Sequence, residues 1–185
     1  QHRKLHRVHR GGQRLGAVVE FVIADRHGVI AQPVHELGRG LALVGGIEKT
    51  ALKLVAAIDL GSNSFHLAIA RLDHGELRRI DSLSEKVQLA AGLDEHNNLT
   101  PASQQRALAC LARFAQRLQA IPAKRLRIVA TNALRQANNA QRLMEQAEQI
   151  LHQRIEIIAG REEARLIYLG VSQTMVTQGR QLVVD

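Results

Sequence analysis

The clearest pattern in the chain is a succession of short apolar runs, each bounded by small polar residues. Residues 54–59 form an aliphatic run that ends in an acid, and residues 65–70 and 77–87 carry two further runs of this kind. Runs of this length that contain Val, Ile and Ala and lie between Gly, Ser and Asn residues are typical of β-strands. The pattern therefore predicts three consecutive strands, joined by a loop at Gly61–Ser64 and a turn at residues 73–76.

The pattern changes to a helical period after Thr100. This threonine is followed by proline, and an N-cap residue with proline at the first helical position marks the start of a helix. Apolar residues then recur at helical spacing as far as Ile121. The elements predicted further along the chain are a strand at 127–131, a helix at about 139–152, a strand at 155–159, a helix from 162 to about 175 and a strand at 181–185. The order βββαβαβαβ indicates an α/β fold with a mixed sheet and helical crossovers.

Residues 1–53 follow neither pattern and differ from the rest of the chain in charge. They hold 9 Lys and Arg against 4 Asp and Glu, so they contribute +5 of the net charge of +8. Strand-like runs occur within them at residues 15–24 and 29–34. We interpret residues 1–53 as a basic, glycine-rich extension of uncertain origin, and residues 54–185 as the main domain. The alternative is a short β subdomain or a basic leader.

Composition excludes several classes of protein. Of the 185 residues 45% are hydrophobic and 23% charged, which is enough apolar material to bury a core. Aromatic residues make up only 2%. That is too few for a protein that stacks nucleic-acid bases on rings, so we expect no specific nucleic-acid partner. No apolar run approaches the roughly 18 residues of a transmembrane helix, so we expect no transmembrane segment.

The single cysteine, Cys110, lies among the apolar positions of the first predicted helix. One cysteine can form neither an internal disulfide nor a thiolate metal site, which indicates a reducing compartment and a cytoplasmic location. No charge close to it in the sequence would stabilise a thiolate. We therefore expect a buried, unreactive thiol and not a nucleophile.

Candidate chemistry begins where the first predicted strand ends. Asp59 is the acid at this strand end, and a loop of small polar residues follows it, with Gly61, Ser62, Asn63 and Ser64. Small residues let a phosphate approach the backbone, whose N–H groups donate to phosphate oxygens together with the hydroxyls. An acid at the strand end can hold a divalent cation or its water. The alternative is an ordinary hairpin turn.

Two later segments carry charged groups at the same expected edge of the sheet. Arg135 comes just after the strand at 127–131, where a guanidinium can make a bidentate contact with a phosphoryl group. The alternative for it is a surface arginine at the start of a helix. Glu162 and Glu163 begin a predicted helix, whose dipole stabilises carboxylates in any case. Beside an anionic substrate, such a carboxylate can also orient and deprotonate water.

These segments, in this order and at this spacing, resemble the family of exopolyphosphatases and guanosine pentaphosphate phosphohydrolases, the Ppx/GppA family. The resemblance extends over residues 54–185 without a gap and does not include residues 1–53. The matching segments are residues 57–66 (AIDLGSNSFH), 85–93 (EKVQLAAGL), 130–135 (ATNALR), 157–168 (IIAGREEARLIY) and 182–185 (LVVD).

The resemblance implies the fold of the actin-like ATPase and sugar kinase superfamily, in which the active site lies between two ribonuclease H-like lobes. Residues 54–185 would form the N-terminal lobe. The resemblance also implies that Gly61–Ser64 is the first phosphate loop. It further implies that Arg135 binds the phosphate under attack, and that Glu163 is the general base for water.

The resemblance implies a cofactor as well. Asp185 is similar to the acid that binds Mg²⁺ at the start of the second phosphate loop, with Asp59 as its counterpart on the first loop. In this family a glycine-rich loop and the second lobe follow that acid, whereas this chain ends at Asp185. We therefore expect the 185-residue chain to have little or no activity alone, because one of the two phosphate loops and one wall of the cleft that the resemblance implies would be missing. The resemblance implies a homodimer for the full-length enzyme.

Two substrates remain open within the family, and both are attacked by water. One reaction removes orthophosphate from the end of inorganic polyphosphate, and the other hydrolyses the 5′ end of guanosine pentaphosphate. Arg161 and the segment 131–135 favour the exopolyphosphatase branch, which is our expectation. A non-catalytic phosphate- or nucleotide-binding module is the competing class, but a binding protein has no need of a base such as Glu163. A nucleic-acid module led by residues 1–14 rests on charge alone.

A chain that starts at Lys53 should fold without the extension, because the first apolar strand lies wholly after this residue. We expect its melting temperature to lie within a few degrees of that of the 185-residue chain, measured by circular dichroism in one buffer. Aggregation of the shortened chain, or a large drop in its melting temperature, would show that residues 1–53 belong to the domain.

Overall fold

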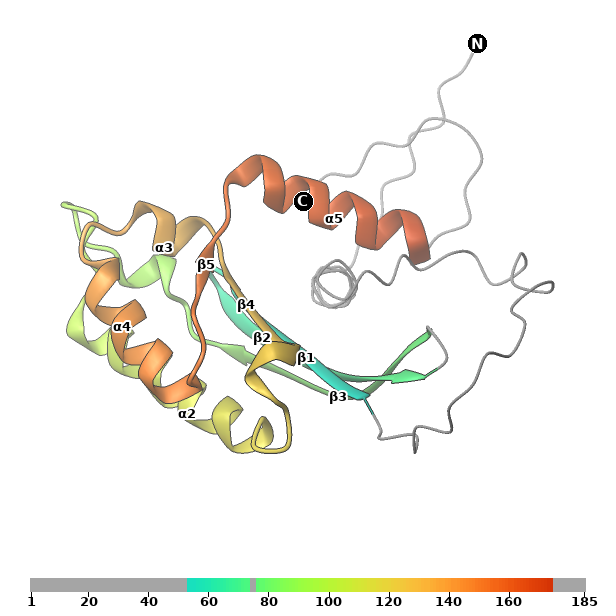
Figure 1. The fold of residues 1–185 in the computed structure, drawn as a ribbon. Helices are drawn as coiled ribbons and strands as arrows, with labels where there is room; N and C mark the ends of the chain where they lie inside the picture. The colour runs from blue at the N-terminus through green and yellow to red at the C-terminus, as the bar shows by residue number, and fades with distance from the viewer. Residues whose placement is uncertain (1–52, 74–75, 175–185) are drawn as a thin grey trace, which may run out of the picture.

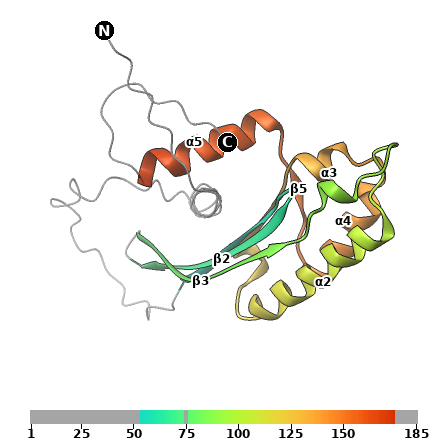
Figure 2. The same ribbon diagram turned by 180° about the vertical axis from the view of Figure 1, so that it is seen from behind.

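The computed structural model describes residues 53–73 and 76–174, which form a five-stranded mixed sheet with helices on both faces (Figures 1 and 2). The order of the strands across the sheet is β3-β2-β1-β4-β5. The strands are β1 (Lys53–Leu60), β2 (Ser64–Asp73), β3 (Glu76–Lys86), β4 (Leu126–Ala130) and β5 (Glu156–Ile157).

The first three strands form an antiparallel meander, whereas β4 and β5 extend the sheet in parallel with β1. In the parallel pair, Leu60 at the end of β1 lies beside Ala130 at the end of β4. The carboxyl ends of the two central strands therefore meet at one edge of the sheet. Ligands of open α/β sheets bind at this edge.

The helices form two layers. In Figures 1 and 2, α2 and α4 cover one face of the sheet and α5 lies over the other. The helices are α2 (Pro101–Arg117), α3 (Asn132–Gln136), α4 (Ala140–Leu151) and α5 (Gly160–Thr174), with short 3₁₀ turns at Ala90–Gly92 and Ala123–Arg125. Within the described residues, no helix is long and apolar enough to cross a membrane.

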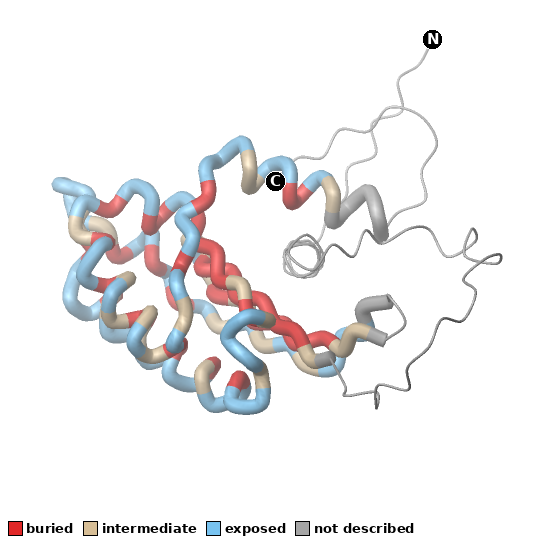
Figure 3. Tube along the Cα trace, in the orientation of Figure 1, coloured by how far each residue is buried: buried red, intermediate tan, exposed pale blue. Residues whose placement is uncertain are grey.

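Each face of the sheet has its own apolar core, because successive side chains of a strand point to opposite faces. The larger core packs Ile58 and Leu67 of the sheet against α2 and α4, with Phe114 at its centre. The smaller core packs Ala57 against Leu166 of α5. Most residues of the central strands are accordingly buried (Figure 3).

Most of the predicted elements are confirmed, with shifted ends. The meander, the strand β4 and the helices α2, α4 and α5 are present, and Thr100 caps α2 by accepting a hydrogen bond from the N–H of Ser103 at 3.4 Å. The helix predicted to reach Ile121 ends at Arg117. The strands predicted at 15–24, 29–34 and 181–185 lie outside the described residues.

Two predictions at the edge of the sheet were wrong in detail. The strand predicted at 155–159 contains only Glu156–Ile157, and α5 begins earlier than predicted, at Gly160. Residues 132–136, for which the sequence predicted no element, form the short helix α3. It forms because the backbone N–H groups of Arg135 and Ala137 donate to carbonyls four residues earlier, at 3.1 Å.

Cys110 is fully buried in the larger core, which confirms the expectation from the sequence. Burial raises the pKa of its thiol to about 12, and the nearby carboxylate of Glu85 acts in the same direction. A neutral thiol in an apolar core packs as a small hydrophobic group. Cys110 therefore belongs to the core and not to the chemistry.

Cys110 should react with a thiol reagent at pH 8 at least about 100-fold more slowly in the folded chain than in the same chain unfolded in urea. Because the folded state holds the thiol proton more tightly, the stability that this group contributes is lost as the pH rises above the usual value of 9.0 toward about 12. The rate of thiol modification at pH 8, followed by mass spectrometry in the folded and in the unfolded chain, checks the difference in reactivity. Rapid modification of the folded chain would contradict it.

Candidate functional site

The loop between β1 and β2 lies at the edge where β1 and β4 end. Its first residue, Gly61, leaves no room for a side chain, since a Cβ there would lie 2.7 Å from the carbonyl oxygen of Ser64. The carbonyls of Ser62 and Asn63 accept hydrogen bonds from the backbone N–H groups of Ala90 and Gln88, at 2.9 and 2.8 Å. The loop is therefore tight, and hydrogen bonds from the segment that follows β3 hold its backbone in place.

The loop is also joined to the segment that follows β4. The hydroxyl of Ser62 accepts a hydrogen bond from the N–H of Ala133, at 3.2 Å. The N–H of Thr131 lies 3.4 Å from the carbonyl oxygen of Leu60, so the two chains run side by side where their strands end. The short helix α3 consequently starts directly against the phosphate loop that the sequence predicted.

Arg135 projects from α3 toward the segment that joins β5 to α5. Its Nη1 donates to the carbonyl oxygen of Ile158 at 2.6 Å, and its Nη2 donates to Oδ1 of Asn132 at 3.1 Å. Its side chain is 33% exposed, so the guanidinium is both held and accessible. Arg135 lies in the last turn of the short helix α3, not at a helix start, and this helix carries the residue to the edge of the sheet.

Glu163 meets Arg135 at this edge. It lies in the first turn of α5, and its Oε2 lies 3.7 Å from Nη1 of Arg135. Its side chain is 25% exposed. Two segments that follow neighbouring parallel strands thus bring a guanidinium and a carboxylate together.

The neighbouring acid, Glu162, has a different environment. Both of its oxygens accept hydrogen bonds from Arg165, at 2.7 Å each. The bond from Arg165 lowers the pKa of Glu162 below its ordinary value, and the charges of Arg165, Arg127 and Arg161 act in the same direction. A carboxylate that is paired in this way is a poor acceptor for a proton. Glu163 is the acid that faces the guanidinium of Arg135, and on that geometry it is the candidate for a base.

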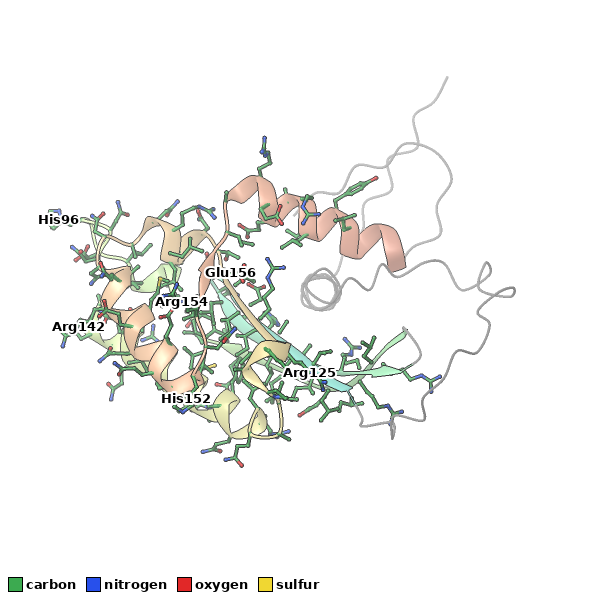
Figure 4. The ribbon with its side chains drawn as sticks, in the orientation of Figure 1. His96, Arg125, Arg142, His152, Arg154 and Glu156 are labelled. Carbon is green, nitrogen blue, oxygen red and sulfur yellow. The ribbon has the colours of Figure 1, made fainter. Side chains whose placement is uncertain are left out.

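A second ion pair joins the neighbouring strands β4 and β5. Arg127 of β4 is only 13% exposed and donates from Nε and Nη2 to one oxygen of Glu156, at 3.3 and 3.1 Å. Figure 4 shows Glu156 on β5, where the chain leads toward α5. This pair fastens β4 to the short strand β5 and so supports the segment that carries Glu163.

Asp59 is buried at the end of β1, with 3% of its surface exposed. By alternation along the strand it lies on the same face as Val55 and Ala57, the face that α5 covers. Its partner directly across the β1–β2 pair is His66. Burial lowers the pKa of His66, so this imidazole is neutral at neutral pH and adds no positive charge beside the acid.

The structure thus brings together Gly61–Ser64, Arg135 and Glu163, with Asp59 at the adjoining strand end. Asp185 lies outside the described residues. In the part of the chain that is described, no three or more His, Cys, Asp or Glu side chains form a group that could hold a metal ion. Sequence reasoning missed Asn132, whose spacing from Arg135 is the i, i+3 spacing of a helix.

Comparison with known proteins identifies the family to which the chain belongs. Residues 68–185 match the model of the Ppx/GppA phosphatase family. A guanosine-5′-triphosphate,3′-diphosphate pyrophosphatase of Vibrio parahaemolyticus is 52% identical over 132 residues, which are 71% of this chain and 27% of that protein. One of the same name from Aliivibrio fischeri is 48% identical over 136 residues, 74% of this chain and 27% of that protein. The chain therefore spans about a quarter of the length of these relatives.

Solved structures show the same fold. The Ppx/GppA family member of Aquifex aeolicus superposes with a TM-score of 0.61 at 27% identity, over 67% of this chain and 40% of that one. An exopolyphosphatase of Cytophaga hutchinsonii gives a TM-score of 0.56 at 26% identity, over 60% and 36%. The described residues thus form a ribonuclease H-like α/β lobe of the actin-like ATPase superfamily, the fold implied by the resemblance in sequence.

Replacing Gly61 with alanine should destabilise the 185-residue chain by about 1–3 kcal/mol, because the new methyl group meets a backbone oxygen that cannot move alone. Gly160→Ala is the matched control, since a Cβ there would lie 3.6 Å from Nη2 of Arg135, an ordinary contact. Urea unfolding of both variants measures the difference. Equal stability of the two variants would show that the loop is not tightly folded.

Proposed function

Because the chain belongs to the Ppx/GppA phosphatase family, we propose that it supplies the N-terminal lobe of a hydrolase that removes the terminal 5′ phosphate of guanosine pentaphosphate as orthophosphate. The reacting bond is a phosphoanhydride. Water attacks the terminal phosphorus, the bond to the bridging oxygen breaks, and a proton of the water must be taken up.

The observation that carries this proposal is the contact of Arg135 with Glu163, 3.7 Å apart at the edge of the sheet beside the loop Gly61–Ser64. A phosphoryl group bound by a guanidinium has its negative charge neutralised while the transition state forms. A carboxylate next to the same guanidinium lies close to the phosphorus under attack. This is the place from which a general base reaches the attacking water.

In this proposal the three parts have separate roles. Glu163 orients the water and accepts its proton, and Arg135 holds the phosphate under attack. The loop Gly61–Ser64 receives phosphate oxygens on its N–H and hydroxyl groups. Since the hydroxyl oxygen of Ser62 already accepts the N–H of Ala133, its own hydrogen can be donated to a phosphate oxygen.

Magnesium is part of the proposal. The donors at this edge are the carboxylate of Asp59 and the hydroxyls of the loop, and hard oxygen donors of this kind suit Mg²⁺, which keeps several waters and takes one or two carboxylates from the protein. Asp59 would be one ligand, and Asp185 the second. When bound, the ion would neutralise charge on the phosphate chain.

The choice of guanosine pentaphosphate departs from our expectation from the sequence. Arg161 and the segment 131–135 favoured polyphosphate. However, relatives that are about half identical to this chain over the aligned residues are named guanosine-5′-triphosphate,3′-diphosphate pyrophosphatases. The exopolyphosphatase of Cytophaga hutchinsonii shares 26%. The higher identity favours the guanosine substrate, and polyphosphate is the second candidate.

A chimera tests the proposal. We expect the Vibrio parahaemolyticus relative, with its matched 132 residues replaced by those of this chain, to release phosphate from guanosine pentaphosphate with a higher kcat/KM than from polyphosphate. Glu163→Gln in the chimera should lower kcat by roughly 10² to 10⁴ with little change in KM, because only the transfer of the proton is lost. Arg135→Ala should impair both constants.

The matched control is Glu162→Gln, which removes the neighbouring acid and leaves Glu163 in place. Phosphate release is measured in steady state with each substrate. Full activity of Glu163→Gln would end the proposed role of this residue, and a loss that appears only with Glu162→Gln would move that role to Glu162. A preference for polyphosphate would support the second candidate.

A further inference from the structure

Arg135 depends on a neighbour that has no role in the proposed chemistry. Asn132 lies one helical turn before it on α3, and its Oδ1 accepts a hydrogen bond from Nη2 of Arg135 at 3.1 Å. Helix α3 has only five residues, and helices this short have little stability of their own. Its side chains can therefore be held in place only by specific contacts.

An arginine that binds phosphate must hold its guanidinium plane in one orientation. A free arginine side chain has about 2 kcal/mol of rotamer entropy to lose on binding. The bond to the carbonyl of Ile158 and the ion pair with Glu163 both act at one nitrogen, Nη1, and the group can still turn about that nitrogen. The bond from Nη2 to Asn132 fixes a second point, so that the plane is set before a substrate arrives.

The chemical type of the two acceptors matters as much as their positions. Both are neutral oxygens, an amide of the side chain and a carbonyl of the backbone. Neutral acceptors orient a guanidinium without cancelling its charge, and the carboxylate that faces Arg135, that of Glu163, lies 3.7 Å from Nη1. Arg165, by contrast, gives two hydrogen bonds to the carboxylate of Glu162, so a carboxylate already neutralises its charge.

We propose that Asn132 is a positioning residue, which orients the guanidinium of Arg135 for the terminal phosphate of the substrate while leaving its positive charge available. This rests on the proposed function, in which Arg135 holds that phosphate. Asn132 also begins the helix whose next residue, Ala133, donates its N–H to Ser62 of the phosphate loop. The short helix α3 thereby contacts the phosphate loop and also orients the guanidinium of Arg135.

The first experiment needs no activity. In the 185-residue chain labelled with ¹⁵N-arginine, Asn132→Ala should speed the rotation of the Arg135 guanidinium about tenfold, as expected for the loss of a hydrogen bond to a charged group. Asn132→Asp keeps an acceptor at this position and should restore slow rotation. Asn138→Ala is the matched control, because this exposed asparagine donates to the carbonyl of His96 and not to Arg135.

The second experiment measures kinetics in the chimera. Asn132→Ala should lower kcat/KM for guanosine pentaphosphate about tenfold, and it should have no further effect when Arg135 is already alanine, because the residue acts through Arg135. Asn138→Ala should leave kcat/KM unchanged. A general structural effect would instead lower the activity by the same factor in both backgrounds.

The outcomes separate the two proposals. Unchanged rotation in Asn132→Ala, or an equal loss of kcat/KM with and without Arg135, overturns the positioning role. Full activity of the Arg135→Ala chimera refutes the proposed role of Arg135 instead. If the parent chimera is inactive, the proposed function fails, while the rotation measurement still decides whether Asn132 orients Arg135.

Discussion

The parallel pairing of β1 with β4 is the constraint on which the rest of the site depends. It places Leu60 beside Ala130, so that the segments leaving the two strands emerge together. One becomes the tight loop that begins at Gly61, and the other becomes α3. The hydrogen bond between Ser62 and Ala133 follows from that proximity, and so does the position of Arg135. Pairing of the same strands in any other register would separate the loop from the arginine.

The arginines of the described residues differ in what they bind. Arg117 pairs with Asp81 and Arg113 with Glu85, and these pairs join α2 to β3 on the outer side of the larger core. In such pairs a carboxylate neutralises the guanidinium, which makes them suited to holding elements together. Arg135 has its two hydrogen bonds to neutral oxygens and a carboxylate at the longer distance of 3.7 Å. That arrangement leaves charge for an anion, as phosphoryl transfer requires.

Local pattern was enough to predict most of the strands and the long helices, and it placed Asp59, Arg135 and Glu163 at or just beyond strand ends. The strand end at Asp59 and the turn at Gly61 were predicted because an apolar run stops there at small polar residues. The short helix α3 was missed because its five residues show no helical period. The hydrogen bond from Arg135 to the carbonyl of Ile158 could not be predicted either. It uses a backbone carbonyl, which every residue has, and it depends on the pairing of β4 with β5.

That pairing makes Arg135 and Glu163 dependent on each other. The ladder between β4 and β5 contains only two residue pairs, too few to fix the start of α5 with accuracy. Beyond it, the N–H of Ile158 donates to Ala130, and the carbonyl of Ile158 accepts from Arg135. The arginine that would bind phosphate therefore also fastens the segment that leads to Glu163. A substitution of Arg135 would remove this contact as well as the charge, so we expect the effects of substituting Arg135 and Glu163 not to add.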